Sequence, residues 1–328
     1  MRRLIIDTDP GIDDAIALLF LCAAAAAPAT RLQIDGVTTV GGNADLDQVT
    51  GNALRLLEVA GRTDIGVYRG SEGRAARGRE FSPDVHGADG LGGEGGRTVT
   101  MREREESAVD FLLSHTAAHP GEVTLLTLGP LTNVAAAVAA DPAFAGNVRS
   151  LVLMGGAEGG GNMTQWAEFN LWCDPAASEA VFSAGFPDVV MVGLDATAEA
   201  DLTPGIGELL LRLDTPVSRF IHAITRTYAN FAFAANGSLS FDLHDPLAAA
   251  YLLDPEVIAT AEADVTIAVD GEQEGRSLVA RTGDFPGTAA NARVAIGADT
   301  ARFYRLLLTT LFPESAAEVE RVVADEYR

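Results

Sequence analysis

Four carboxylates lie within eight positions near the start of the chain, in the segment Asp7-Thr8-Asp9-Pro10-Gly11-Ile12-Asp13-Asp14. The segment contains no Lys or Arg that could neutralise them. Like charges at this density raise one another's pKa unless a cation or strong hydrogen-bond donors offset the repulsion. An ordinary acidic helix cap needs only one side-chain oxygen. We therefore interpret the segment as a cation site.

The flanking elements place this acidic segment between a buried strand and a buried helix. Residues 4–6 form a short apolar strand, and the apolar run 15–21 predicts a helix. The Pro-Gly pair between them suits a tight turn, because proline lacks a backbone donor and glycine adopts conformations closed to other residues. Asp13 and Asp14 then fall in the first helical turn, where the helix dipole favours anions.

Strand-like and helical runs alternate along the rest of the chain, which predicts an α/β fold with a mostly parallel, doubly wound sheet flanked by helices. We find no repeat and no linker, so residues 1–328 are expected to form a single domain. The predicted strands are 4–6, 34–39, 123–128, 150–154, 189–194, 265–269 and 278–281, and the predicted helices are 15–21, 46–60, 134–140, 216–233, 246–253, 300–311 and 315–323.

Composition excludes several classes of partner and mechanism. The formal net charge of -23 argues against binding to nucleic acid or to an anionic membrane surface. The chain has no lysine, which excludes mechanisms that require one. Cys22 and Cys173 lack any paired spacing and are expected to be buried free thiols. We find no signal-peptide or membrane-spanning run, and we expect a cytoplasmic location.

A second candidate constellation is His244-Asp245-Pro246, ahead of the apolar run 247–253. Asp245 is expected to cap this helix, with Pro246 at the first helical position. The Asp-Pro pair recurs elsewhere in the chain, so capping alone would explain Asp245. His244 distinguishes this copy, because a histidine beside a metal ligand can donate a proton near neutral pH.

Polar groups also gather in a loop after a predicted strand, at Asn162, Glu168 and Asn170. Amides and carboxylates of this kind can form paired hydrogen bonds with neighbouring sugar hydroxyls. Ligands of open α/β sheets bind at the carboxyl ends of the strands, where the acidic segment is also predicted to lie.

Seven motifs occur in order along the chain. The first is residues 7–15, and the others are Gly41-Gly42-Asn43, His86-Gly87, Gly129-Pro130-Leu131-Thr132-Asn133, Met154-Gly155-Gly156, Ala167-Glu168-Phe169-Asn170 and His244-Asp245-Pro246. The set resembles the calcium-dependent nucleoside hydrolases of the inosine-uridine preferring type. The first motif is highly specific, and the order and spacing of the others argue against coincidence.

This resemblance implies an enzyme that hydrolyses the N-glycosidic bond of ribonucleosides to ribose and free base. It implies a Ca²⁺ ion held by Asp9, Asp14, Asp245 and the backbone carbonyl of Leu128, a position where threonine is familiar in the family. Asp9 would also act as general base on a calcium-bound water, and Asp7 would support the site. The residues that match the family's substrate site are Asp13, Asn43, Met154, Asn162, Glu168 and Asn170.

The chemistry of the bond agrees with these implied roles. Cleavage of an N-glycosidic bond builds positive charge on the ribose, which carboxylates and amides stabilise. From motif position we assign His244 as the acid that protonates the departing base and His86 as a base-contacting group. The resemblance also implies a small-molecule nucleoside as partner, a homodimer or homotetramer, and a role in nucleoside salvage.

Two other functions compete with this interpretation. A haloacid-dehalogenase-like phosphatase is suggested by Asp7-Thr8-Asp9 after a strand, but Gly11 stands where that family has Thr or Val, and the chain lacks its lysine. A catalytically silent calcium- or ligand-binding relative would be expected to lack some ribose or leaving-group residues, yet all the matched ones are present.

Base preference depends on the stretch 225–242 and on the loop around His86. Tyr228, Phe231 and Phe233 could stack on any base, or could form a core-facing helical stripe. Having His rather than Trp before Asp245 disfavours the class that grips purines with tryptophan. The two tryptophans that flank Glu168 fit either packing or a pocket.

Overall fold

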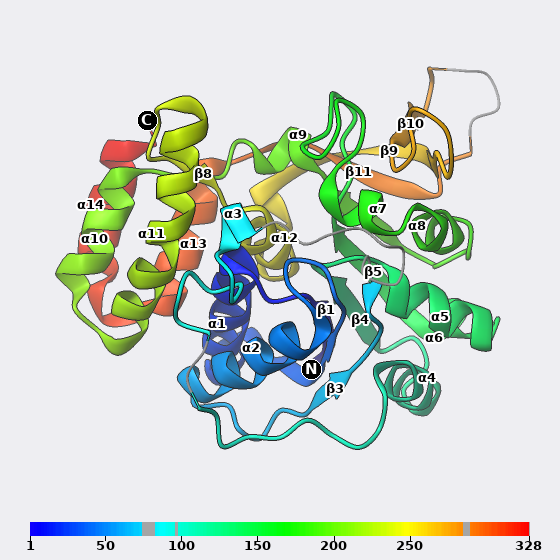
Figure 1. Cartoon of the computed structure of the whole chain (residues 1–328), viewed down its shortest axis with the longest axis horizontal. Coiled ribbons are helices and arrows are strands. Elements are labelled where there is room, and N and C mark those ends of the chain that lie inside the picture. The colour runs from blue at the N-terminus through cyan, green and yellow to red at the C-terminus, as the bar shows by residue number, and fades with distance from the viewer. Residues whose placement is uncertain (74–82, 96–97, 285–288, 328) are drawn as a thin grey trace.

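The computed structural model describes residues 1–73, 83–95, 98–284 and 289–327, and its centre is a nine-stranded sheet (Figure 1). The strand order is β10-β9-β11-β6-β5-β4-β1-β2-β3. All neighbouring strands from β11 to β3 pair in parallel, whereas β9 pairs antiparallel with both β10 and β11. The prediction of a mostly parallel sheet is therefore confirmed. The strands are β1 Arg2–Thr8, β2 Leu32–Thr39, β3 Val67–Arg69, β4 Val123–Thr127, β5 Val148–Met154, β6 Val189–Val192, β9 Ile258–Ile267, β10 Ser277–Arg281 and β11 Ala292–Ala298.

Helices cover both faces of this sheet, and a two-stranded ribbon lies apart from it. The ribbon pairs β7 Asp201–Leu202 with β8 Phe241–Asp242. The α-helices are α1 Ile12–Ala26, α2 Leu46–Val59, α3 Pro83–His86, α4 Ala108–Ala118, α5 Thr132–Ala140, α6 Phe144–Asn147, α7 Phe169–Cys173, α8 Pro175–Phe182, α9 Leu194–Thr197, α10 Pro204–Leu213, α11 Pro216–Asn236, α12 His244–Leu253, α13 Thr300–Leu311 and α14 Ala316–Glu326.

Strand β1 is buried on both faces, which explains its continuous apolar sequence. Leu4 and Ile6 belong to an apolar cluster with α1, α2, α12 and α13. Ile5 points to the other face, into a cluster with α4, α5 and α8. Helices α10, α11, α13 and α14 gather at one end of the molecule (Figure 1).

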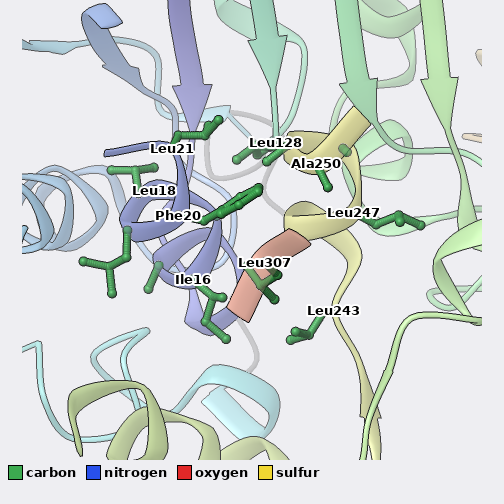
Figure 2. Packing of buried hydrophobic residues seen from close by; sticks show 14 of the residues in the cluster. Ile16, Leu18, Phe20, Leu21, Leu128, Leu243, Leu247, Ala250 and Leu307 are labelled. Carbon is green, nitrogen blue, oxygen red and sulfur yellow. The ribbon is translucent and has the colours of Figure 1, made fainter. Parts of the chain in front are cut away.

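Packing between α1 and α12 fixes the two segments that carry the acidic motifs. Figure 2 shows Phe20 of α1 in the same packed layer as Leu247 of α12 and Leu307 of α13. All three side chains are at most 1% exposed. Because cores tolerate little displacement of large side chains, the first turns of the two helices are held at a defined separation.

The crossover connections leave a switch point between β1 and β4. From β1 the chain proceeds to β2 and β3 on one side, and from β4 it proceeds to β5, β6 and β11 on the other. Such a switch opens a crevice at the carboxyl ends of the strands. Asp9 follows β1 and Leu128 follows β4, so both residues lie at this point.

Several predicted boundaries differ from the structure. Helix α12 begins at His244, so the prediction that Asp245 caps it is wrong; Leu243 occupies the cap position without a side-chain cap. The Asp245 carboxyl is engaged with Asp14 of α1 instead. Residue 194 begins a helix rather than ending a strand, and β11 was not predicted at all. Within the described ranges, every helix is too short or too polar to span a bilayer.

Candidate active site

A cavity of about 420 Å³ opens at the carboxyl edge of the sheet, beside the switch point. Asp9 and Asp14 do not line it and are fully buried. The structure brings the other ten of the twelve predicted site residues together in its wall: Asp13, Asn43, His86, Leu128, Met154, Asn162, Glu168, Asn170, His244 and Asp245.

Asp9 is a buried carboxylate with one unused oxygen. Its Oδ2 atom accepts a hydrogen bond of 2.6 Å from the backbone N–H of Asn43. Its Oδ1 atom has no hydrogen-bond partner in the described part of the chain. A Cβ atom added at Gly42 or Gly129 would clash with this carboxylate, so the two glycines make room for it. Burial, followed by the charge of Asp14, raises the pKa of Asp9 well above its usual value.

Asp13, Asp14 and Asp245 form an acidic cluster next to Asp9. One carboxylate oxygen of each lies within 4.8 Å of the other two. Asp14 accepts hydrogen bonds from Thr8 Oγ1, from the Gly11 N–H at 3.0 Å and from Asn43 Nδ2 at 3.0 Å. Burial raises the pKa of all three carboxyls. The charges of neighbouring carboxylates raise the pKa of Asp14 and Asp245 further.

The chemistry of this donor set fits a metal ion. Buried carboxylates that approach one another need either a shared proton or a cation. A hard divalent cation prefers oxygen ligands of this kind. Asp13, Asp14 and Asp245 could hold such an ion, and the orphaned Oδ1 atom of Asp9 offers a further oxygen.

Glu168 and Asn170 join the ends of β4 and β5 in one hydrogen-bonded network. Asn170 Nδ2 donates to the carbonyl of Leu128 at 2.8 Å and to that of Met154 at 3.1 Å. Glu168 caps α7, where its carboxylate accepts from the N–H of Asn170 and from that of Gly156, both at 2.9 Å. Burial raises the pKa of Glu168 to about 7. A carbonyl has two lone pairs, so Leu128 keeps one for a further contact.

His86 lies against the first turn of α1. Its Nδ1 atom accepts a hydrogen bond of 3.1 Å from the backbone N–H of Ile12. Burial lowers the pKa of His86 to about 4, so the ring is neutral at pH 7. Because Nδ1 accepts, the proton of the neutral ring is on Nε2, which is then a hydrogen-bond donor.

His244, the first residue of α12, is held by a residue that the sequence did not single out. Its Nδ1 atom lies 2.7 Å from Thr197 Oγ1, at the end of α9. Thr197 is fully buried, and no motif marks it. Burial lowers the pKa of His244, while the charge of Asp13 opposes this shift.

The aromatic residues of α11 separate into pocket and surface. Tyr228 stacks on Phe241 with ring centroids 4.5 Å apart and meets His86 edge-on at 5.6 Å. Tyr228 and Phe231 line the cavity, whereas Phe233 is 58% exposed and does not. Neither tryptophan lines it; the guanidinium of Arg276 lies 4.5 Å from the ring centroid of Trp166.

The loop that carries Asn162 is anchored from several elements. Asn162 Oδ1 accepts the N–H of Phe169 at 2.9 Å. Asp195 accepts the N–H groups of Glu158 and Gly159 at 2.6 and 2.8 Å. These bonds hold the loop over the carboxyl end of β5, close to Glu168.

Six other residues of the cavity wall were assigned no role from the sequence. These are Val85, Met163, Phe169, Leu194, Ala198 and Asp242. Most are apolar and carry no chemical signal in the sequence. Asp242 is the exception, because it is ionisable and lies only two positions before His244.

Comparison with known proteins agrees with this arrangement. Residues 4–305 match the family model described as inosine-uridine preferring nucleoside hydrolase. A pyrimidine-specific ribonucleoside hydrolase, RihB, from Escherichia coli O1:K1 / APEC is 34% identical over 307 residues, which is 93% of this chain and 96% of that protein.

The similar solved structures are also nucleoside hydrolases. The plant nucleoside hydrolase PpNRh1 superimposes with a TM-score of 0.85 at 35% identity, covering 94% of this chain and 98% of that chain. A purine-preferring ribonucleoside hydrolase from Gardnerella vaginalis gives a TM-score of 0.86 at 27% identity, covering 98% of this chain and 100% of that chain. The chain therefore belongs to the inosine-uridine preferring nucleoside hydrolase family, whose members cleave the N-glycosidic bond of nucleosides.

Proposed function

We propose that this enzyme hydrolyses ribonucleosides to ribose and free base with a Ca²⁺ ion held by Asp9, Asp14, Asp245 and the Leu128 carbonyl. The observation that carries the proposal is the Oδ1 atom of Asp9, which has no hydrogen-bond partner among the described residues and lies within a buried group of carboxylates beside the cavity. Calcium takes six to eight oxygen ligands in a flexible geometry, which suits this mixture of carboxylates and a carbonyl. When bound, such a cation stabilises negative charge and acidifies water.

The other residues around the cavity have distinct proposed roles. Asp9 is proposed to take a proton from the attacking water as general base. Asp13, Asn162, Glu168 and Asn170 are proposed to hold the ribose, and Met154 is proposed to pack against the sugar. Their negative and dipolar groups favour the positive charge that develops on the ribose during cleavage. Asn43 supports Asp9 and Asp14 through the hydrogen bonds described above.

The histidines are proposed to serve the leaving base. His86 lines the cavity and is proposed to contact the base, and His244 is proposed to supply the proton to the departing base, favoured by the nearby charge of Asp13. Protonation of the departing base is needed most when the base would otherwise leave as an unstable anion.

His244→Gln tests this assignment. We expect kcat for a natural nucleoside to fall by about 10²- to 10⁴-fold, the range for loss of general acid catalysis. An aryl riboside that releases a stable phenolate should be affected far less, because its leaving group needs no proton. His222→Gln is the matched control, since His222 lies on α11 and does not line the cavity. Equal losses on both substrates, or an unchanged turnover, would refute the acid role.

A nucleoside panel tests the proposed function itself. Inosine, uridine, cytidine, adenosine and guanosine are each incubated with calcium and then with excess chelator, and the products are identified. We expect at least one to release free ribose and free base with calcium only. Nucleoside monophosphates should be poor substrates, because their phosphate would meet the acidic cluster without a basic partner. Failure on all five nucleosides, or efficient cleavage of a monophosphate, would contradict the proposal.

The remaining expectations belong to the same proposal. A single catalytic domain over residues 1–328 is supported by the one sheet whose strands extend from Arg2 to Ala298. A homodimer or homotetramer, a cytoplasmic location and a role in nucleoside salvage rest on the sequence and on the family resemblance. The alternatives, a phosphatase or a silent binding relative, are not favoured by the comparisons.

A further inference from the structure

Asp242 is an ionisable residue of the cavity wall to which the proposed mechanism gives no role. It ends the short strand β8, where it pairs with Asp201 of β7. The side chain is half-buried and lines the cavity. Its carboxyl group forms no hydrogen bond or ion pair in the part of the chain that the structure describes. A carboxyl group in such a position is available to a ligand.

The surroundings of Asp242 place it at the aromatic end of the cavity. Its charge acts on Tyr228, whose ring stacks on the neighbouring Phe241 and touches the edge of His86. Phe231, Leu194 and Ala198 provide apolar lining in the same cavity. The carboxylates and amides proposed to bind the ribose lie instead in the segments that follow β1 and β5. A nucleoside with its ribose on those groups directs its base toward the aromatic residues.

Asp242 is charged at the mildly alkaline pH of an ordinary assay. Burial, followed by the charge of Asp201, raises the pKa of Asp242 to about 6. At pH 8 the group is therefore a carboxylate, which accepts hydrogen bonds but cannot donate them. The titratable groups that face it are Tyr228 from α11, Asp201 from β7 and Tyr304 from α13, and none of them carries a positive charge that would neutralise it.

We propose that Asp242 selects nucleobases with an exocyclic amino group, cytosine or adenine, over their oxo counterparts, uracil or hypoxanthine. This inference rests on the proposed function. An amino group donates a hydrogen bond to the carboxylate, whereas a carbonyl oxygen at the same place brings two acceptors together. A site that is built to bind one hydrogen-bonding group rejects an analogue that leaves its polar atom unpaired.

The test compares kcat/KM within two substrate pairs at pH 8 with calcium, cytidine against uridine and adenosine against inosine. In the unmodified enzyme we expect the amino member of at least one pair to be favoured by about 10-fold or more, as for a hydrogen bond to a charged group. Asp242→Asn should bring that ratio toward 1, because an amide can rotate to donate as well as accept. Asp201→Asn is the control, since Asp201 carries the neighbouring carboxyl but does not line the cavity, and should keep the ratio.

The outcomes separate this inference from the proposed function. A preference for the oxo member in both pairs would overturn the selection by Asp242, and so would a ratio that is the same in Asp242→Asn and in the unmodified enzyme. The comparison of the two substrate pairs in the unmodified enzyme needs no variant, so it tests the inference even if Asp242→Asn folds poorly. Failure on all four nucleosides would overturn this inference, and failure on guanosine as well would overturn the proposed function.

Discussion

Replacing Asp9 by Asn is expected to lower kcat for the best nucleoside by about 10³-fold or more, because the change removes the proposed general base together with a calcium ligand. The amide oxygen can still accept the N–H of Asn43, so the local backbone should keep its position. The measurement is steady-state kinetics at saturating calcium, with circular dichroism to confirm that the variant is folded.

Asp7→Asn is the matched control for this prediction. Asp7 is equally buried and belongs to the same segment, and like Asp9 it has one oxygen, Oδ2, without a hydrogen-bond partner in the described residues. It differs from Asp9 because burial alone raises its pKa, with no contribution from a neighbouring carboxylate. Its Oδ1 atom accepts hydrogen bonds from Thr38 Oγ1 and Asn133 Nδ2. An asparagine oxygen can accept both bonds, so we expect a fall in kcat of less than about 10-fold. The assignment of Asp9 would be refuted if Asp9→Asn kept a tenth of the activity, or if both variants lost the same amount.

Asp245→Asn is expected to have opposite effects on stability and on activity. In chelator-treated protein the variant should melt at a higher temperature, because the Asp245 carboxyl is buried against Asp14 and within reach of Asp13 and Asp9, all of the same charge. With calcium present, kcat/KM should fall by about 10²-fold or more and the calcium affinity should fall with it, since a charged ligand is lost. Thermal melts with and without calcium, together with kinetics, test both halves.

A second Asp-Pro pair in the chain supplies the control. Asp254 accepts the backbone N–H of Glu256 and is paired with Arg302, far from the acidic cluster. Asp254→Asn removes an attractive pair and should lower the melting temperature slightly, with activity unchanged. If Asp245→Asn melted lower than the unmodified protein after chelation, the repulsion that we infer in the acidic cluster would be absent.

The acidic segment and the fold class could be predicted from the sequence because their signals are local. The continuous apolar run at residues 4–6 indicates a strand that is buried on both faces, and β1 has that environment. The density of carboxylates after this strand indicates a cation site without information from any other segment of the chain. Helix α2 likewise begins at the predicted residue and ends one residue early, at Val59.

Features that depend on contacts between distant segments could not be predicted. Helix α12 begins at His244, and Asp245 contacts Asp14, which lies in the first helix of the chain, instead of capping its own helix. The hydrogen bond of Thr197 to His244 joins two elements whose spacing in sequence carries no pattern. The short strand β8 places Asp242 in the cavity wall, but two residues are too few for a periodic signal.

We propose that one calcium ion, bound by the acidic cluster at the switch point, is required for nucleoside hydrolysis. The most direct test of this requirement is a titration of calcium into chelator-treated protein, with bound ion and release of free ribose measured in the same samples. We predict that turnover rises in proportion to bound calcium and reaches its plateau at one ion per chain, and that Asp9→Asn shows no such rise. Full turnover in calcium-free protein, or calcium binding that leaves turnover unchanged, would contradict this requirement for calcium.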